Sequence, residues 1–444
     1  MKKRELIFFA ALATFLSANA QEKQTWSLED CINYALEKNI QLQQNKISLQ
    51  ESEVDVKTAK AALFPSLSFN TGHNIVNRPY QENSATVSGT EIISSNNKTT
   101  YNGSYSLSAL WNGGQRLNNI KQQKKNQEIA ELTVAETENT LKEEITKLFL
   151  QILYADESVN INKGTLEVSK ATYERAKELF NQGSISKADL AQLEAQVGND
   201  QYQLVTSESS LRNYKLQLKQ MLELDGNMEM ELELPVLDDE KVMQLLPNQD
   251  EVYQTALANR PEIQSSKLSI DNSKLAISAA KSGYYPSISL SASTSSMTNN
   301  ASQNNWAQQM KYGWNNMIGL TVSVPIFNNR QTKSAVEKAQ FQYNSSLLNL
   351  QDKQKGLYTE IETLWLDALN AQQQYAAAEV KLKSSQTSFD MVSEQFRLGM
   401  KNTVELLTEK NNLLSAQQQR VQAKYMAILN RTLLDFYAGK DIEL

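Results

Sequence analysis

Residues that interrupt helices are scarce in this sequence. Its 444 residues include 15 glycines and 7 prolines, well below the average usage of either type. No proline lies between Pro79 and Pro235 or after Pro325, so nothing in these two long stretches forces a helix to stop. The pattern predicts long helices and argues against a compact α/β enzyme.

Cysteine and histidine are almost absent. Cys31 and His73 are the single residues of their types, too few for a disulfide framework, a structural zinc site or a Cys/His catalytic pair. We therefore expect no catalytic residue, no cofactor and no metal. The acidic pairs Glu143-Glu144 and Asp238-Asp239 are interpreted as solvated helix and linker charges, and Cys31 as a small buried residue of the first helix.

The first twenty residues have the pattern of a secretory signal peptide. Three basic residues at positions 2–4 precede an apolar run over residues 6–16, and residues 18–20 form an Ala-x-Ala cleavage site. Removal of residues 1–20 changes the formal net charge from −6 to −8, which disfavours a nucleic-acid partner. No later segment reaches the ~18 consecutive apolar residues of a spanning helix. We expect an exported protein without a helical membrane anchor.

The sequence contains an internal duplication. Phe64-Pro65-Ser66 corresponds to Tyr285-Pro286-Ser287 at an offset of 221 residues. Phe180-Asn181-Gln182-Gly183 corresponds to Phe396-Arg397-Leu398-Gly399 at an offset of 216. The chain is therefore predicted to be two copies of one structural unit.

Each copy is predicted to have the same order of elements. A helix (28–63 or 251–282) leads into a β-hairpin, which leads into a long helical hairpin. A signal peptide is predicted over 1–20 and a linker over 236–247. The first repeat spans 21–235, with a β-hairpin at 66–111 and a helical hairpin at 115–223. The second repeat spans 248–444, with a β-hairpin at 287–327 and a helical hairpin at 330–437.

The predicted strands alternate apolar with small polar residues. The aromatic-Pro-Ser segments end the preceding helix and begin an extended strand, after which serine or asparagine separates successive apolar residues. The apolar positions predicted to face lipid are Tyr105, Leu107, Ile318, Leu320 and Val322. The Ser/Asn/Thr-rich segments 74–100 and 295–311 are predicted to be extracellular loops.

Strands of about ten residues with one apolar face fit a transmembrane β-barrel whose interior is wet. A half-buried strand of a soluble sandwich has the same period and is the alternative. Only four such strands are predicted, whereas a membrane barrel needs at least about eight. Several chains are therefore expected to share one barrel.

The long polar-rich segments carry heptad patterns. Residues 115–181 contain apolar positions that recur every seven residues: Ile145, Ile152, Val159, Leu166, Tyr173 and Phe180. The second copy repeats the pattern, and a heptad period predicts a coiled-coil seam. The Phe-x-x-Gly turns supply a left-handed helix cap, and Ser186 or Asn402 can cap the returning helix. A plain soluble coiled coil is the alternative for the heptads taken alone.

The sequence resembles the outer-membrane efflux protein family, the TolC-like exit ducts of tripartite efflux pumps and type I secretion systems. Both aromatic-Pro-Ser segments, both Phe-x-x-Gly turns and Val404-Glu405-Leu406-Leu407 carry the resemblance in duplicated order. It implies a mainly α fold with a β-barrel contribution. The implied homotrimer has a twelve-stranded outer-membrane barrel and a periplasmic α-barrel, with an equatorial belt drawn from residues 22–38, 224–248 and 437–444.

The resemblance also implies partners and site residues. The partners are a periplasmic adaptor (membrane fusion) protein, an inner-membrane transporter of RND, ABC or MFS type, and outer-membrane lipid. The adaptor-docking tips are Phe180, Gly183, Phe396 and Gly399. The periplasmic aperture or gate consists of Asp189, Lys401, Glu405 and Thr408, in which Lys401 is the nearest donor for a bond between helices and Thr408 replaces a second acidic residue. The alternative for these charges is a solvated helix start favoured by the helix dipole.

We therefore expect an outer-membrane channel-tunnel that passively conducts substrates from a pump and adaptor to the exterior. It is not expected to be an enzyme. A periplasmic adaptor or scaffold is the main alternative, but such a protein normally needs one long hairpin and no barrel strands. A secreted enzyme would need catalytic groups that the sequence does not offer.

Overall fold

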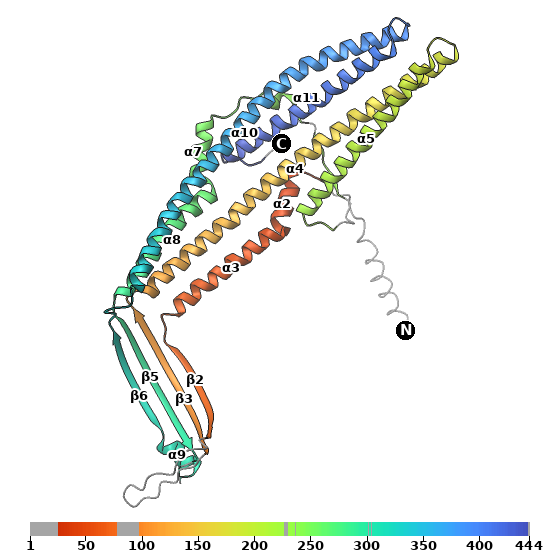
Figure 1. Cartoon of the computed structure of the whole chain (residues 1–444). Helices are drawn as coiled ribbons and strands as arrows, with labels where there is room; N and C mark the ends of the chain where they lie inside the picture. Colours follow the sequence, from red (N-terminus) through yellow and green to blue (C-terminus); the bar gives the residue numbers. More distant parts are fainter. Residues whose placement is uncertain are drawn as a thin grey trace, which may run out of the picture. The chain divides into compact units, whose positions relative to one another are not determined.

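The computed structural model describes residues 25–77, 97–225, 230–235, 237–300, 302 and 304–442 (Figure 1). The predicted signal peptide, residues 1–20, and most of the first interstrand loop, residues 78–96, lie outside this part of the chain. Within the described residues, no helix is both long enough and apolar enough to cross a membrane.

Each repeat opens with two helices where the sequence predicts one. They are α2 (Leu28–Lys38) with α3 (Ile40–Ala61), and α7 (Gln249–Asn259) with α8 (Pro261–Lys281). Asn39 leaves the helical conformation, and its side chain accepts a hydrogen bond of 3.1 Å from the Leu42 amide, which caps α3. Arg260 is extended because it precedes Pro261. The single-helix expectation is therefore wrong in both repeats.

The long helical hairpins have matching lengths in the two repeats. They are α4 (Gln115–Asn181) with α5 (Lys187–Met221), and α10 (Gln331–Arg397) with α11 (Thr403–Tyr437). In each hairpin the returning helix runs beside the first (Figure 1). The heptad positions Ile145 and Ile152 are fully buried, as are their counterparts Ile361 and Ala368. The period of seven thus marks the side chains that hold the helices together.

Four of the described strands form an antiparallel sheet in the order β2-β3-β5-β6 (Figure 1). They are β2 (Ser66–Asn77), β3 (Asn97–Asn112), β5 (Ser287–Asn299) and β6 (Asn315–Ser323). The central pairing of β3 with β5 joins the two repeats, with Leu107 opposite Ala292. Strands β2 and β6 form the two edges of this sheet.

The second β-hairpin departs from its predicted limits. Strand β5 continues to Asn299 and is followed by α9 (Trp306–Tyr312), so the segment 295–311 is not simply a loop. Asn305 caps α9, and the Ser296 hydroxyl donates a hydrogen bond of 2.8 Å to the Met310 carbonyl. Strand β6 ends at Ser323, earlier than predicted, because Pro325 has no amide to donate to a ladder.

The segments expected to form an equatorial belt pack into a large hydrophobic core. Strand β1 (Thr25–Trp26) pairs in parallel with β4 (Glu231–Leu232), and α6 (Asp239–Val242) follows. Cys31 is completely buried in the same cluster as Ile145 and Ile428, in agreement with its interpretation as a small core residue.

The compact units of the structure do not follow the sequence repeats. One unit contains the described residues of 1–46, 132–264 and 351–444, and the second contains those of 47–131 and 265–350. Each unit therefore includes residues from both copies of the duplicated sequence. The first holds the tips of the helical hairpins, and the second holds the four-stranded sheet.

Candidate functional site

The two tips of the helical hairpins have the same backbone geometry. Gly183 and Gly399 follow the last turns of α4 and α10 with φ values of 73° and 75°. The Gly183 amide donates to the Phe180 carbonyl at 2.9 Å, and the Gly399 amide donates to the Phe396 carbonyl at 3.0 Å. At each tip, the amide of the residue after the glycine donates to the carbonyl of the residue before the phenylalanine, which completes a Schellman cap. The predicted left-handed glycine turns are therefore present in both repeats.

The acidic residues predicted at the aperture form capping boxes at the starts of the returning helices. Asp189 and Ser186 exchange hydrogen bonds at the start of α5, and Glu405 and Asn402 do so at the start of α11. Hydrogen bonds from Ser186 and then from Thr403 lower the pKa of Asp189 below its ordinary value. The bond between Asp189 and Thr403 brings the starts of α5 and α11 close together.

Lys401 lies beside Glu405 on the same helix start. Its Nζ is 2.5 Å from Glu405 Oε1, and this hydrogen bond is the main cause of the lowered pKa of Glu405. We expected Lys401 to bond between helices, but within one chain its bond is local. Thr408 is exposed and donates to the Val404 carbonyl at 2.8 Å, so its hydroxyl satisfies the helix backbone. Asp189, Lys401, Glu405 and Thr408 all lie at the tips, and their role as a gate stays a prediction.

A shared hydrophobic cluster joins the two tips. Its buried members come from all four helices of the hairpins: Ala176, Leu193, Phe396 and Leu406. Phe396 is buried whereas Phe180 is only partly covered, so the two equivalent aromatic residues have different surroundings. The tips therefore present one packed surface rather than two independent turns.

The residues predicted to face lipid lie on one face of the sheet. Leu107 is opposite Leu67 and Ala292, and Ala292 is opposite Ile318 in the next strand. Ile318 and Leu320 are 83% and 69% exposed in the single chain. The exposed apolar side chains of this face include Leu67, Phe69, Ile75, Tyr101, Tyr105, Leu107, Trp111, Ile288, Leu290, Ile318, Leu320 and Val322.

The opposite face of the sheet carries mainly small polar side chains, although Val76, Leu110, Met297 and Met317 also lie on it. The hydroxyls of Ser66 and Ser108 are 2.8 Å apart, as are those of Ser68 and Ser106. These directly opposed serines bond across the strands. A sheet with one apolar face and one hydroxyl-rich face suits a boundary between lipid and water.

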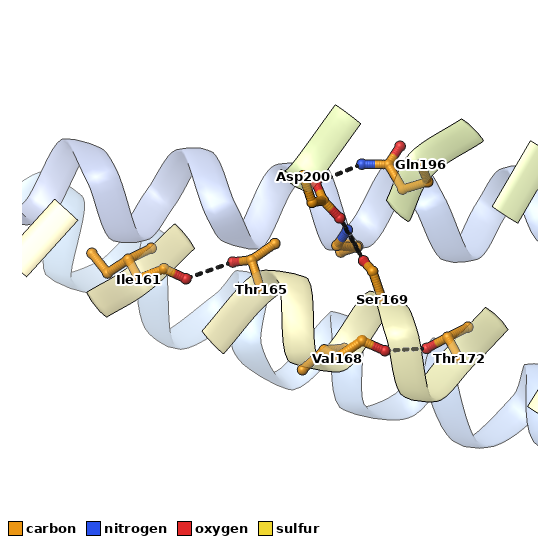
Figure 2. A network of polar contacts seen from close by, with 8 residues as sticks. Ile161, Thr165, Val168, Ser169, Thr172, Gln196 and Asp200 are labelled. Carbon is orange, nitrogen blue, oxygen red and sulfur yellow. Dashed lines mark hydrogen bonds and ion pairs between the residues drawn. The ribbon is translucent and has the colours of Figure 1, made fainter. Parts of the chain in front are cut away.

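A buried ion pair that the sequence did not predict lies between the helical hairpins. Lys410 of α11 contacts Asp200 of α5 and Ser169 of α4, and all three residues are buried. Burial lowers the pKa of Lys410, although Asp200 acts in the opposite direction. Figure 2 shows Ser169 and Gln196 pointing toward Asp200. No local pattern predicts this contact because 210 residues separate its charged partners.

The interpretation of Glu143 as a solvated charge is wrong. Arg260 Nη2 bonds Glu143 Oε1 at 2.7 Å with both side chains largely buried, and the guanidinium stacks 3.7 Å from the centre of the Tyr437 ring. Burial raises the pKa of Glu143 despite this partner. Asp239 is also paired, with Arg420 at 2.6 Å and Lys424 at 2.7 Å, so it ties α6 to α11.

These features define an internally duplicated architecture of long helical hairpins joined to a short amphipathic sheet. The chain belongs to the outer membrane efflux protein family, whose model matches residues 31–223 and 252–440. The family resemblance, the mainly helical fold class and the outer-membrane location are therefore confirmed. Both family and fold are those of channel proteins.

Sequence and structure comparisons give three informative relatives. Alkaline protease secretion protein AprF of Pseudomonas aeruginosa is 25% identical over 193 residues, 43% of this chain and 39% of AprF. Outer membrane protein TolC of Escherichia coli is 22% identical over 309 residues, 68% of this chain and 62% of TolC. The match thus spans less than two thirds of either protein. The solved CmeC outer membrane channel of Campylobacter jejuni has a TM-score of 0.78 at 18% identity, covering 97% of this chain and 92% of CmeC.

Proposed function

We propose that three copies of this chain assemble into an exit duct that passively conducts substrates from the periplasm to the exterior. The main support is the four-stranded sheet, which exposes one apolar face and ends in two edge strands. An open sheet edge is unfavourable in lipid because its backbone groups have no water to bond. Three sheets joined edge to edge provide a closed barrel that removes this cost.

The hairpin tips are the proposed docking surface for a periplasmic adaptor protein. Their two Schellman caps and shared hydrophobic cluster supply a rigid pair of turns. The adaptor connects the duct to an inner-membrane transporter of the RND, ABC or MFS type, which supplies the motive force. The family description, outer membrane efflux protein, and the name alkaline protease secretion protein AprF support a place in efflux or secretion, but they assign no substrate to this chain.

Assembly and location can be tested on the protein extracted from cells. We expect it in the outer-membrane fraction, as particles of three chains by native mass measurement in mild detergent, and we expect heating to convert them to single chains. A stable particle of one chain in the soluble periplasmic fraction would contradict the proposed duct.

A further inference from the structure

Helix α9 is fixed against one end of the four-stranded sheet. The Ser296 hydroxyl of β5 donates a hydrogen bond of 2.8 Å to the Met310 carbonyl. The Asn299 amide donates to Gln309 Oε1 at 2.7 Å, and Gln309 Nε2 donates to the Asn304 carbonyl at 2.7 Å. Figure 1 shows α9 at the end of the sheet opposite to the end from which the chain enters α10. The helix therefore has a defined seat on β5.

The turn after α9 is packed so closely that a side chain does not fit. A Cβ atom added to Gly313 would lie 2.8 Å from the Gln309 carbonyl oxygen and 3.0 Å from the Met297 carbonyl oxygen. The φ of Gly313 is −81°, which other residues adopt readily, so the position needs glycine for close approach. The end of α9 consequently rests directly on the backbone of β5.

The α9 helix lies on the apolar side of the sheet. The register of β5 with its two neighbours runs without a break, so Ser296 and Thr298 share the face of Leu290. Leu290 is exposed, whereas Ser296 and Thr298 are buried. The apolar face is the one proposed to contact lipid. The seat of α9 is therefore on the membrane side of β5.

The position of α9 along the strands coincides with one limit of the apolar face. Thr298 is opposite Tyr101, and Tyr101 and Trp111 lie ten residues apart on the same face of β3. At ~3.4 Å per residue and a strand tilt of about 40°, this segment rises about 26 Å along the membrane normal. The apolar band of a membrane barrel is about 25 Å tall and is flanked by aromatic residues. The seat of α9 is therefore level with one boundary of the band.

The outward surface around α9 carries side chains typical of a membrane interface. Trp306 and Tyr312 of α9, with Trp314 directly after it, form an aromatic rim whose members are 61%, 72% and 63% exposed. Tryptophan and tyrosine are enriched where a membrane meets water, because each ring is apolar and carries one polar group. Lys311 is also exposed, and a lysine at this level can extend its ammonium group to anionic headgroups.

We propose that α9 is an interfacial anchor, a helix that lies among the lipid headgroups at the outer surface of the membrane. The proposal rests on the proposed duct, because that assembly places the apolar face of the sheet in lipid. The aromatic rim lies at the boundary with the acyl chains, and Lys311 lies within reach of headgroup phosphates. The anchor fixes the depth at which the hairpin of β5 and β6 sits in the membrane.

Spin labels on single cysteines measure the depth of α9 in assembled trimers. In a Cys31→Ser background, the label is attached at Ala307→Cys on the exposed surface of α9, at Ile318→Cys on the apolar face, or at Leu398→Cys at a hairpin tip. The trimers are reconstituted into vesicles of phosphatidylcholine and phosphatidylglycerol. The accessibility of each label to oxygen, which concentrates in lipid, is divided by its accessibility to a water-soluble nickel chelate.

We expect the accessibility ratio at Ala307 to lie between a high ratio at Ile318 and a low ratio at Leu398. A ratio at Ala307 equal to either reference overturns the proposal, since it places α9 in the acyl core or in water. Shielding of the Ala307 label from both reagents places α9 against another copy and also overturns it. A low ratio at Ile318 is a different result, which contradicts the proposed duct itself.

Removal of two aromatic side chains tests what holds α9 in the interface. Trp306→Ser with Tyr312→Ser should shift the ratio at the Ala307 label toward the value at Leu398. Tyr202→Ser is the matched control and should leave the ratio unchanged, because Tyr202 is comparably exposed at 68% but belongs to α5 in the other compact unit. An unchanged ratio in the α9 variant, or an equal shift in both variants, overturns the proposal.

Discussion

At the residue scale, the tip glycines hold a backbone conformation that other residues adopt at a cost. Gly399 has a φ of 75° and open space where a Cβ would lie, so the penalty for a side chain there comes from the backbone alone. We expect Gly399→Val to destabilise the tip by about 1–2 kcal/mol and to reduce export while trimers still assemble. The measurement compares export with trimer yield in the same cells.

Gly198 gives the matched control for this substitution. It lies inside α5 and likewise has no atom close to a Cβ position, but its backbone is helical. Gly198→Ala should leave export unchanged and stabilise the helix by about 0.5–1 kcal/mol. Wild-type export by both Gly399→Val and Gly183→Val would remove the tips from the docking site.

The capping boxes at the tips should be sensitive to acid. The pKa values of Asp189 and Glu405 are lowered in the folded chain, chiefly by Ser186 and Lys401 respectively. Their contribution to stability is present above the ordinary carboxyl pKa of about 4 and is lost as the pH falls through the lowered value. We expect amide exchange at both helix starts, corrected for its intrinsic rate, to rise on acidification. In Asp189→Asn/Glu405→Gln it should not change with pH, and an equal acid response in that variant would assign the effect to other groups.

Among the secondary-structure elements, the two faces of the sheet should differ in how well they tolerate an arginine. Leu320 lies on the exposed apolar face, and its neighbour Thr321 points to the hydroxyl-rich face opposite Ser289. Leu320→Arg should cost about 2–4 kcal/mol near the bilayer centre, whereas Thr321→Arg should cost much less. Trimer yield in outer-membrane fractions measures the difference. Equal yields of the two variants would contradict the assignment of an apolar outer face, and a lower yield for Thr321→Arg would reverse it.

The predictable elements are those with a regular period. Alternation at Leu107 and Ile318 and the heptads around Ile145 identified the amphipathic strands and the long hairpins, because sheets and coiled coils repeat these patterns. The helix breaks were missed in both repeats: Pro261 could have signalled the one in the second repeat, whereas the break at Asn39 depends on a side-chain cap. Long-range pairs such as Lys410 with Asp200 could not be predicted, since their partners are distant in sequence and a lysine in a helix usually faces solvent.

At the scale of the whole molecule, three copies of the tip would place three sets of carboxylates near one axis. Lys401 neutralises Glu405 locally at 2.5 Å. Lys401→Ala should therefore increase repulsion between copies and raise single-channel conductance. Lys274→Ala is the control, because Lys274 forms a comparable exposed pair with Asp271. Equal conductance in both variants and the wild type would indicate that the tip charges are only helix caps.

Substitutions at Glu405 and Thr408 test whether the proposed aperture selects cations. Glu405→Ala should reduce cation selectivity and weaken block by multivalent cations, because it removes carboxylates from the proposed aperture. Thr408→Asp should strengthen that block by adding a carboxylate one turn further along α11. Unchanged selectivity and block in both variants would place the constriction elsewhere.

Purified trimers inserted into a planar lipid bilayer, with no adaptor, transporter or nucleotide added, test directly whether the assembled chain is a passive duct. We expect discrete single-channel current steps driven only by the applied voltage. Folded trimers that insert into the bilayer but carry no current at any voltage would contradict it.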